Sequence, residues 1–403
     1  MIKAQTLKGF RDFLPKEAKL RERLTLAMKS VFAKYGFEPL ETPALEYAQT
    51  LLGKNGSEAD KLLYTFKDHG GRDVGLRYDQ TVPLARVIAQ YGNELTFPFK
   101  RYQVQPVWRA ENTQKGRFRE FIQCDIDTIG SPLPIADADI LATAYETFQT
   151  IGITDITIQI NDRTIFDNLG LSKEEISVID KLEKIGEKKV ITLLTELGRS
   201  DATNILKRLM DAKPTENLRS ILQLALALGV PGGFIEFSPT LARGLDYYTS
   251  TIFEIVSPSA PFGSLAGGGR FDQLIEKFSG TSYPAVGIAF GFDRIIEVLS
   301  ERDPSTDSST LVSIAIYDDT TTLEATKISA TLRKNGIATD LAFSVEPKLD
   351  RELKFADKKC IPYTVIVGPD EVRDGVVVLK SMKEKTQERI PLTTVIQKLS
   401  RDQ

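Results

Sequence analysis

The stretch from Val107 to Asp127 constrains the fold of this chain most, because its residue types alternate with a period of two. In a β-strand, successive side chains point to opposite faces of the sheet. Even-numbered positions are mostly apolar: Trp108, Phe118, Ile122, Cys124 and Ile126. Odd-numbered positions carry nearly all the polar groups and one aromatic ring: Arg109, Glu111, Arg117, Arg119, Phe121, Gln123, Asp125 and Asp127. The pattern predicts a hairpin with one strand through Glu111, the loop NTQKG, and a second strand from Arg117.

The polar face of this hairpin has two interpretations. In the first, it is a solvated sheet face with cross-strand salt bridges, as in many antiparallel sheets. In the second, its arginines bind an anionic ligand, because a guanidinium grips phosphate or carboxylate oxygens with two parallel hydrogen bonds. The hairpin alone leaves both interpretations open, so the rest of the chain has to separate them.

Length, charge and rare residues limit the class of protein. The chain has 403 residues, too many for one compact core, so two or three domains are expected. Its net charge of −3 gives no global attraction to a polyanion, so any nucleic-acid contact has to use local basic patches. The one histidine, His69, lies in the turn-like stretch KDHGGRD, which argues against a Ser-His or Cys-His catalytic pair unless that turn lies in the site.

The cysteines and the apolar stretches of the sequence bear on the cellular location of the protein. Cys124 and Cys360 fit no metal-binding spacing, and such isolated cysteines favour a reducing compartment without structural disulfides. No apolar run approaches the length of a membrane span, and the first residues lack the apolar core of a signal peptide. A cytoplasmic protein that does not enter a membrane is therefore expected.

The periodicity of apolar residues, together with glycine and proline residues that end helices and strands, divides the chain into segments. The first part, 1–160, is expected to begin with a helix at 16–35 stopped by Gly36 and a short extended segment near Pro39 and Pro43 that suits an edge or interface strand. A hairpin then leads into a helix that Thr81 caps, with Pro83 in its first turn. The hairpin of 107–127, a helix after Pro134 and a strand at 153–162 complete this part.

The later segments differ in composition. Residues 161–233 read as a helical insertion, with a capping box at Ser172 and Glu175. Strand patterns return in 234–303, and the polar stretch ERDPSTDSST is expected to be a linker. Residues 310–403 alternate short strands with helices and predict a small α/β domain.

Four other short stretches carry functional groups. RYDQT (77–81) places a carboxylate and a hydroxyl at a strand end, and ARGLDYYTSTIFE (242–254) places Arg243 and a tyrosine pair before a strand. AGGGRFD (266–272) reads as a glycine turn before a helix, where backbone can approach a ligand closely. AFGFDRI (289–295) places Arg294 in the first turn of a helix. Each stretch taken alone is more often a packing, turn or surface feature.

Together and in this order, these stretches resemble the class II aminoacyl-tRNA synthetases, and among them the histidyl-tRNA synthetases. The helix and strand ending near Pro43 are similar to motif 1, WRAENTQKGRFREFIQCDID to motif 2, and FGFDR to motif 3. RGLDYY and GGGRFD resemble the two histidine-specific signatures, and ELKFADKKCIPYTVIVG resembles the anticodon-binding domain. The sequence departs from the usual pattern at Trp108, where phenylalanine or tyrosine is more frequent, and at Asp79 and Asp127, where many members have glutamate.

The resemblance implies a mixed α/β (α+β) fold in which an antiparallel-sheet catalytic core, 1–160 and 234–303, surrounds the helical insertion 161–233 and precedes an anticodon-binding domain at 310–403. It implies a histidine–tRNA ligase that uses ATP and Mg²⁺, acts on L-histidine and tRNA(His), and forms a homodimer. The implied catalytic residues are Arg109 and Arg243. The implied ATP site comprises Arg109, Glu111, Arg117, Phe121 and Arg294, with Glu111 a candidate for holding Mg²⁺. The implied histidine site comprises Asp79, Gln80, Thr81, Arg109, Gln123, Asp127, Arg243, Tyr247 and Tyr248.

Two alternatives stay within reach of the same core. The regulatory subunit of ATP phosphoribosyltransferase resembles it without being a synthetase, but is expected to lack the terminal domain and the catalytic arginines. Threonyl, prolyl and glycyl synthetases share the three general motifs, whereas RGLDYY argues against them. The presence of Arg109, Arg243 and Arg294 favours the histidine enzyme.

Overall fold

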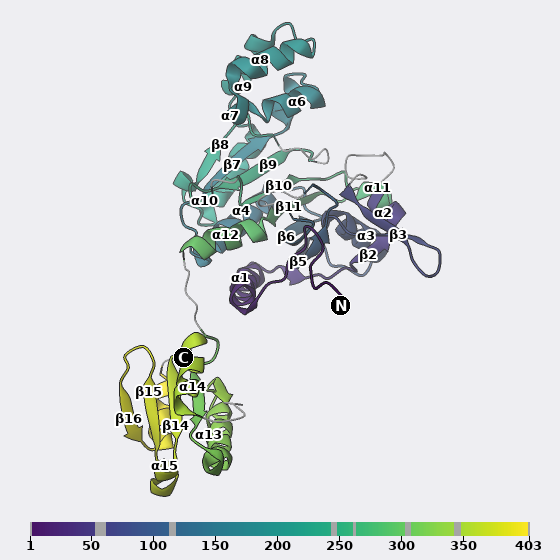
Figure 1. Ribbon diagram of the computed structural model, residues 1–403. Helices are drawn as coiled ribbons and strands as arrows, with labels where there is room; N and C mark the ends of the chain where they lie inside the picture. Colours follow the sequence, from purple (N-terminus) through teal and green to yellow (C-terminus); the bar gives the residue numbers. More distant parts are fainter. Residues whose placement is uncertain are drawn as a thin grey trace. The chain divides into compact units, whose positions relative to one another are not determined.

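The computed structural model describes residues 2–52, 62–112, 118–242, 248–260, 263–302, 308–341 and 348–401. The chain divides into two compact units, Met1–Asp303 and Pro304–Gln403 (Figure 1). Within the described ranges, unit 1 contains an eight-stranded and a three-stranded sheet, and unit 2 contains a five-stranded sheet. No helix in these ranges combines the length and the apolar composition that crossing a membrane requires.

The large sheet of unit 1 is mostly antiparallel. In spatial order its described strands are β1 (Glu38–Pro39), β5 (Phe99–Trp108), β6 (Glu120–Ile129), β11 (Ala285–Phe290), β10 (Ala266–Arg270), β9 (Thr251–Val256), β7 (Thr157–Asp162) and β8 (Ile235–Phe237). β1 pairs in parallel with β5 at one edge, and β8 pairs in parallel with β7 at the other. The proline-containing segment near Pro39 is thus an edge strand, as predicted, because proline cannot donate to a second neighbour.

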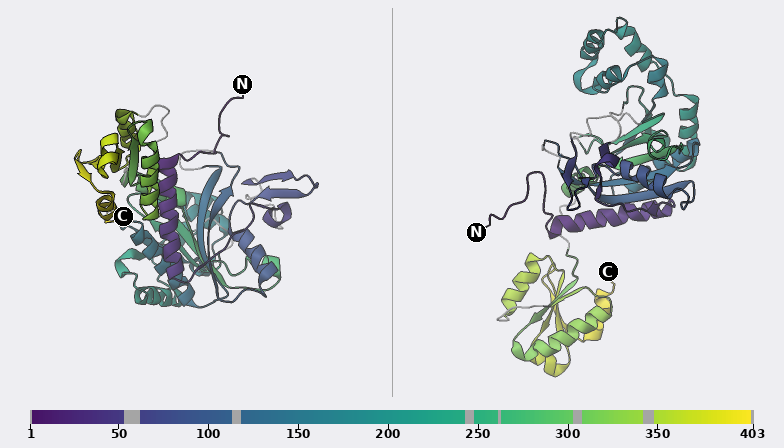
Figure 2. Two further views of the ribbon diagram at one scale, coloured as in Figure 1. Left: turned by 90° about the horizontal axis from the view of Figure 1, so that it is seen from below. Right: turned by 90° about the vertical axis from the view of Figure 1, so that its right-hand side faces the viewer.

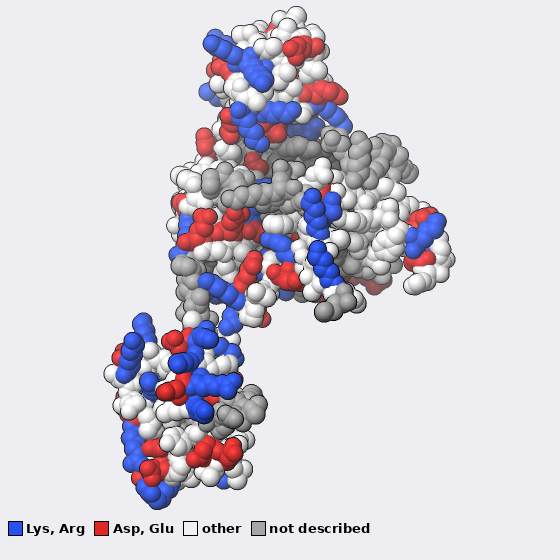
Figure 3. Space-filling view, in the orientation of Figure 1, with Lys and Arg blue, Asp and Glu red and all other residues white. Residues whose placement is uncertain are grey.

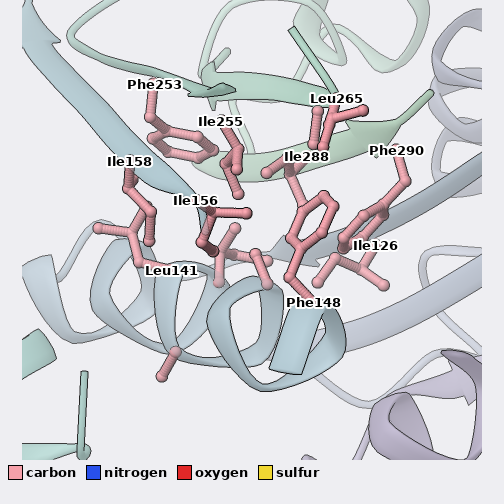
Figure 4. Packing of buried hydrophobic residues seen from close by; sticks show 14 of the residues in the cluster. Ile126, Leu141, Phe148, Ile156, Ile158, Phe253, Ile255, Leu265, Ile288 and Phe290 are labelled. Carbon is pink, nitrogen blue, oxygen red and sulfur yellow. The ribbon is translucent and has the colours of Figure 1, made fainter. Parts of the chain in front are cut away.

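Helices cover one face of this sheet and create the main core. They are α1 (Pro15–Lys34), α4 (Pro134–Thr150), α10 (Glu216–Ala227) and α12 (Phe292–Arg302). α1 and α10 both pack on α4, which contacts β6 and β11. Figure 2 shows the long helix α1, in dark purple, from two further sides. Cys124 and Ile126 on β6 enter this core beside Phe148 of α4, and Figure 4 shows the packed side chains. The prediction that even-numbered positions of the hairpin face a core is confirmed for these strand residues.

The hairpin strands are shorter than predicted. β5 ends at Trp108 and β6 begins at Glu120, although the Arg109 amide still donates to the Arg119 carbonyl at 2.9 Å. Residues 113–117, which include most of the predicted loop and Arg117, lie outside the described residues. The antiparallel pairing of the two strands is as predicted.

A helical segment connects β7 with β8. It consists of α5 (Thr164–Asn168), α6 (Lys173–Ile179), α7 (Leu182–Ile185), α8 (Glu187–Glu196) and α9 (Ala202–Met210), followed by α10 and a short 3₁₀ turn, η2 (Gly232–Phe234). The predicted capping box at α6 is present, with the Ser172 hydroxyl accepting from the Glu175 amide at 3.2 Å. α10 packs into the main core through Leu218, Ile221 and Ala225. The insertion boundaries at 161 and 233 stay a prediction.

The three-stranded sheet precedes the hairpin in sequence. Its strands are β2 (Leu45–Tyr47), β4 (Asp73–Leu76) and β3 (Tyr64–Lys67), flanked by α2 (Ala48–Leu52) and α3 (Thr81–Tyr91). His69 is exposed at the turn between β3 and β4, as predicted. The predicted capping of α3 by Thr81 is wrong. Thr81 is the first helical residue, and the Asp79 carboxylate instead accepts from the Val82 amide at 3.1 Å.

Unit 2 is an α/β domain with its own core, as the sequence predicts. Its described strands lie in the order β13 (Thr339–Leu341), β12 (Val312–Ile316), β14 (Tyr363–Val367), β15 (Val377–Ser381) and β16 (Gln387–Ile390). The associated helices are η3 (Asp319–Thr321), α13 (Thr322–Lys334), α14 (Leu349–Lys358), α15 (Pro369–Asp374) and α16 (Leu392–Leu399). Val312, Ile314 and Val365 pack against Leu332 and Leu399 in this core.

The glycine-rich stretch AGGGRFD corrects the expectation of a turn. Residues Ala266–Arg270 form the buried strand β10, and the short helix α11 (Glu276–Ser279) begins later. A Cβ atom on Gly268 would lie 2.0 Å from the Gly287 carbonyl oxygen and 2.7 Å from a ring carbon of Phe253. The glycine is needed because neighbouring atoms occupy the space of a side chain, so the local sequence looks like a turn although it is sheet.

We predict that Gly268→Ala lowers the free energy of unfolding of unit 1 by about 1–3 kcal/mol, the usual cost of overpacking a core. Gly233→Ala is the control, because a Cβ there meets no heavy atom within 4 Å, and it should change stability by less than about 0.5 kcal/mol. Urea denaturation followed by fluorescence of the single tryptophan, Trp108, measures both. Equal stabilities of the two variants would contradict the packing argument.

Candidate active site

A cavity of about 280 Å³ opens on the sheet of unit 1. Its walls come from the β5–β6 hairpin, from β10 and β11, and from the start of α12. The lining residues are Arg109, Glu111, Phe118, Phe121, Ile122, Gln123, Ser264, Leu265, Ala266, Gly267, Ala289, Phe290, Gly291, Phe292, Asp293 and Arg294. Residues that are far apart in the sequence and were predicted to share an ATP site, Arg109, Glu111, Phe121 and Arg294, therefore line one cavity.

The hairpin wall holds its arginine in a defined position. The Arg109 Nε atom donates to the Tyr78 carbonyl at 3.0 Å. Its guanidinium carbon lies 5.0 Å from the centre of the Phe121 ring, and Nη1 lies 4.0 Å from Oε1 of Glu111. The Tyr78 carbonyl thus orients Arg109 by accepting from one of the five N–H donors of the guanidinium group, and Glu111 lies near another of its nitrogens.

The opposite wall comes from β10, β11 and α12. The Arg294 Nη1 atom donates to the Ser264 carbonyl at 2.6 Å, which fixes this side chain near the beginning of α12. On β11, residue size alternates: Val286, Ile288 and Phe290 enter the main core, whereas Gly287 and Ala289 lie on the other face. Small residues on that face leave room for a ligand above the sheet.

Phe118 corrects the prediction made from residue parity. It was expected on the core face of the hairpin, but it lines the cavity, and the guanidinium carbon of Arg11 lies 3.3 Å from its ring centre. The reason is that β6 begins only at Glu120, so Phe118 precedes the regular strand and its side chain does not follow the two-residue alternation.

Next to the cavity, the odd-numbered residues of β5 and β6 form a buried polar layer. The strand register pairs Arg101 with Asp127, Gln103 with Asp125, and Gln105 with Gln123. Arg101 Nη2 and Asp127 Oδ2 lie 2.6 Å apart, close enough for an ion pair but not aligned as a hydrogen bond, and the Arg101 side chain is fully buried. The Gln123 amide donates to Asp125 at 2.9 Å. The solvated-face interpretation is therefore wrong for this part of the hairpin, which is buried, although the cross-strand ion pair that it expected is present.

Burial changes the protonation of the acids in this layer. Desolvation raises the pKa of Asp127 from 3.8 to about 6, against the opposing influence of Arg101. Desolvation also raises the pKa of Asp125 well above its usual range and that of Asp79, with Arg101 and Arg109 opposing both shifts. Three carboxyl groups and two guanidinium groups thus influence one another in a region with little water.

The two residues after Asp79 have different surroundings. Gln80 donates from Nε2 to the carbonyls of Gln105 and Gln123, both at 3.0 Å, and so ties the start of α3 to β5 and β6. Its Oε1 is buried without a hydrogen-bond partner among the described residues. Thr81 is buried at the first position of α3. The predicted set 79–81 therefore lies beside the polar layer.

Three predicted site residues, Arg117, Arg243 and Tyr247, lie outside the described residues. Tyr248 is described, is only 6% exposed, and packs against Gly269 of β10, where an added Cβ would lie 2.9 Å from the Tyr248 ring. The buried Asn161 amide of β7 donates to the carbonyls of Pro239 and Leu241, both at 2.9 Å. It thereby fixes the backbone just before residue 243.

Sequence reasoning missed Arg101, Gln103 and Gln105, which complete the polar layer. The signal was present, because polar residues already occupy these odd positions upstream of Val107. It also missed Arg77, which donates to the carbonyls of Thr42 and Pro106 at 2.6 and 3.0 Å. These contacts connect the segment after β1 with β5.

We predict a pH-dependent stability from Asp127. Its pKa is about 6 in the folded state and 3.8 ordinarily, so the folded state binds more protons between these values and the free energy of unfolding falls as pH rises from about 4 to about 6. Asp127→Asn removes the group that causes this pH dependence. The free energy of unfolding of the wild type minus that of the variant should therefore decrease from about pH 4 to about pH 6 and be constant above that. Urea denaturation at pH 4.5 to 7.5, followed by Trp108 fluorescence, measures the difference.

Asp155→Asn is the control for that experiment. The pKa of Asp155 is lowered to about 2, with hydrogen bonds from Ser259 and Arg302 prevailing over desolvation. Its contribution is therefore complete above pH 4 and is lost only as pH falls toward 2. The stability difference for this control should be constant from pH 4.5 to 7.5. An equally constant difference for Asp127→Asn would contradict the raised pKa.

Comparison with known proteins places the chain in a family. A family model described as histidyl-tRNA synthetase matches residues 9–295, and one described as anticodon binding domain matches residues 310–402. A histidine–tRNA ligase of Cytophaga hutchinsonii is 36% identical, over 99% of this chain and 100% of the relative. That of Wolinella succinogenes is 37% identical, over 95% of each chain.

Solved structures agree with the sequence comparison. The crystal structure of histidyl-tRNA synthetase from Nostoc sp. PCC 7120 matches with a TM-score of 0.89 and 31% identity, covering 100% of both chains. A Bacillus halodurans structure described as an ATP phosphoribosyltransferase regulatory subunit/histidyl-tRNA synthetase has a TM-score of 0.71 and 22% identity, covering 85% of this chain and 94% of that chain, which shows a shared fold alone. The chain belongs to the histidyl-tRNA synthetase family of class II aminoacyl-tRNA synthetases.

Proposed function

We propose that this chain activates L-histidine with ATP in the cavity between the β5–β6 hairpin and α12, and then transfers the histidyl group to the 3′ end of tRNA(His). The observation that carries this proposal is the arrangement of Arg109, Phe121 and Arg294 around one cavity, directly beside the buried carboxylates of β6. The cavity offers cations and an aromatic ring for a nucleotide, and the polar layer offers acceptors for an amino acid.

The first step requires charge neutralisation more than proton transfer. The carboxylate of histidine is ionised near neutral pH, so it attacks the α-phosphorus of ATP without a general base. The new bond forms an acyl-adenylate, and pyrophosphate leaves. Arg109 is proposed to hold the carboxylate and the α-phosphate together and to stabilise the charge that develops on phosphorus. Arg243 is proposed for the same role because of the family signature RGLDYY.

The same cavity is proposed to position ATP. Phe121 stacks on adenine, and Glu111, Arg117 and Arg294 orient the nucleotide. Mg²⁺ supplies additional neutralisation of the phosphates when bound. Its requirements fit the site, because the Glu111 carboxylate lines the cavity and Mg²⁺ prefers oxygen ligands. In the described part of the chain no group of three or more acidic, cysteine or histidine side chains is arranged to hold a metal, so the phosphates would provide most of the ligands.

The polar layer is proposed to select histidine. We place Asp79, Thr81 and Gln123 around the α-ammonium, with Gln80 in the same site. Asp127 and Tyr248 are proposed to lie near the imidazole, and Tyr247 to line the pocket. A buried acceptor favours a side chain that donates a hydrogen bond, because an apolar competitor leaves the acceptor without a partner. Arg101, 2.6 Å from Asp127, keeps that carboxyl oriented.

Unit 2 and the exposed surface suggest the macromolecular partners. Lysines and arginines are interspersed with acidic residues over the face of unit 2 drawn in Figure 3, and local basic groups of this kind contact phosphates without a strongly basic whole chain. We assign unit 2 to anticodon recognition. Leu45, Tyr47 and Phe66 of the three-stranded sheet are 45%, 51% and 48% exposed, and we assign this apolar surface to a homodimer contact. A cytoplasmic location remains the prediction made from the sequence.

Pyrophosphate exchange with a panel of amino acids tests the proposed function. We predict that L-histidine alone among the twenty amino acids supports ATP–pyrophosphate exchange, because the buried carboxylate layer favours a donor-bearing ring. Charging of a tRNA(His) transcript with labelled histidine tests the second step. Exchange supported by threonine, proline or glycine instead would overturn the choice of amino acid, and no exchange with any would overturn the activity.

We predict that Arg109→Ala lowers the rate of adenylate formation by on the order of 10²–10³, the typical loss for one preorganised transition-state donor. Arg109→Lys should recover only part of the rate, because an ammonium cannot bridge two oxygens in a fork. Arg72→Ala is the control, since Arg72 is exposed at the β3–β4 turn and pairs with Asp68. Single-turnover adenylate formation, measured beside a thermal melt, distinguishes lost chemistry from lost folding. A near-normal rate in Arg109→Ala would refute this role.

A further inference from the structure

The segment before α1 runs along the rim of the cavity. The Arg119 amide donates to the Gly9 carbonyl at 2.9 Å, and Arg119 Nη1 lies 3.5 Å from the Lys8 carbonyl. Arg119 also donates from Nε to the Glu111 carbonyl at 3.1 Å. The backbone of residues 8 and 9 is therefore attached to the same part of the hairpin that forms one wall of the cavity.

Arg11, in this segment, contacts both walls. Its guanidinium carbon lies 3.3 Å from the centre of the Phe118 ring, and its Nη2 donates to Asp293 Oδ1 at 2.9 Å. Phe118 belongs to the hairpin wall and Asp293 to the wall formed by α12, and both line the cavity. One side chain of the N-terminal segment thus contacts two elements whose contact residues, Phe118 and Asp293, are 175 positions apart in the sequence.

A second cation strengthens this junction. Arg21 of α1 donates to the same Asp293 oxygen at 2.6 Å, and its guanidinium carbon lies 3.8 Å from the centre of the Phe13 ring. The side chains of Arg11, Arg21 and Asp293 are 26%, 11% and 16% exposed. Partial burial makes such contacts stronger than ion pairs in open solvent. Two cations on one carboxylate also leave positive charge beside the cavity, next to Arg294.

We propose that Arg11 is a positioning residue for ATP, which sets the separation between the Phe118 wall and the Asp293 wall. This inference rests on the proposed function of the cavity. Phe121 and Arg109 lie on one wall and Arg294 on the other, so a nucleotide has to contact both walls at once. Holding the walls at the right separation before binding removes an ordering cost that the nucleotide would otherwise have to offset.

The test compares Arg11→Ala and Arg11→Lys with Arg208→Ala, an exposed arginine on α9. ATP binding is measured by calorimetry, the ATP and histidine KM values by pyrophosphate exchange, and folding by a thermal melt. Arg11→Ala should raise the ATP Kd and KM on the order of tenfold, with kcat, the histidine KM and Tm close to the control values. Arg11→Lys should lie between, because lysine retains the charge for Asp293 but cannot stack flat on Phe118.

A double-mutant cycle tests whether the effect passes through Phe118. In a Phe118→Leu background, Arg11→Ala should weaken ATP binding by clearly less than tenfold, because the stacking partner is already lost. An unchanged ATP Kd in Arg11→Ala would overturn the proposal, as would a fall in Tm and kcat at constant ATP Kd, which indicates a merely structural role. ATP binding measured by calorimetry requires no amino acid. If histidine supported no pyrophosphate exchange, the proposed function would be refuted, but the effect of Arg11→Ala on the ATP Kd could still be measured.

Discussion

The pairing of β5 with β6 determines the site, because it places an arginine opposite a carboxylate in a layer without solvent. Arg101 is fully buried and faces Asp127 in the strand register. Removing either partner would leave an uncompensated buried charge. A shift of β6 by one residue relative to β5 would exchange the two faces of β6 and move Cys124 and Ile126 out of the core, so the apolar core and the ion pair specify the same register.

The neighbouring strands give this layer its space. Gly287 is paired with Asp127, and a Cβ atom on Gly287 would lie 1.9 Å from Oδ1 of Asp127. Gly267 is paired with Ala289, and both line the cavity. Glycine weakens a strand because it costs backbone entropy and packs no side chain. Here the same lack of a side chain allows the carboxylate to lie against the sheet and keeps the cavity open.

The sequence allowed the two faces of the hairpin to be predicted, because period-two alternation is a local property that burial enforces. It also allowed most helices, the capping box at Ser172 and the separate terminal domain to be predicted. The role of AGGGRFD could not be predicted from the sequence. Gly268 is needed because of Gly287 and Phe253, which approach it only in the folded sheet. The cavity-facing position of Phe118 likewise depends on where β6 begins, and Arg11 meets Asp293 only across the folded unit.

The chemistry of the layer works against stability and in favour of binding. Asp79, Asp125 and Asp127 have raised pKa values because burial disfavours their charged forms, and the nearby Arg101 and Arg109 compensate only in part. A ligand that brings a positive charge into this layer supplies the missing compensation, so part of the free energy that folding spends on burying acids returns when the ligand binds. In the proposed function, an amino acid would meet this need through its α-ammonium group, whereas its carboxylate would meet the arginines of the adjoining cavity. The opposite charges at the two ends of one small substrate would therefore fix its direction, with the carboxylate toward the nucleotide.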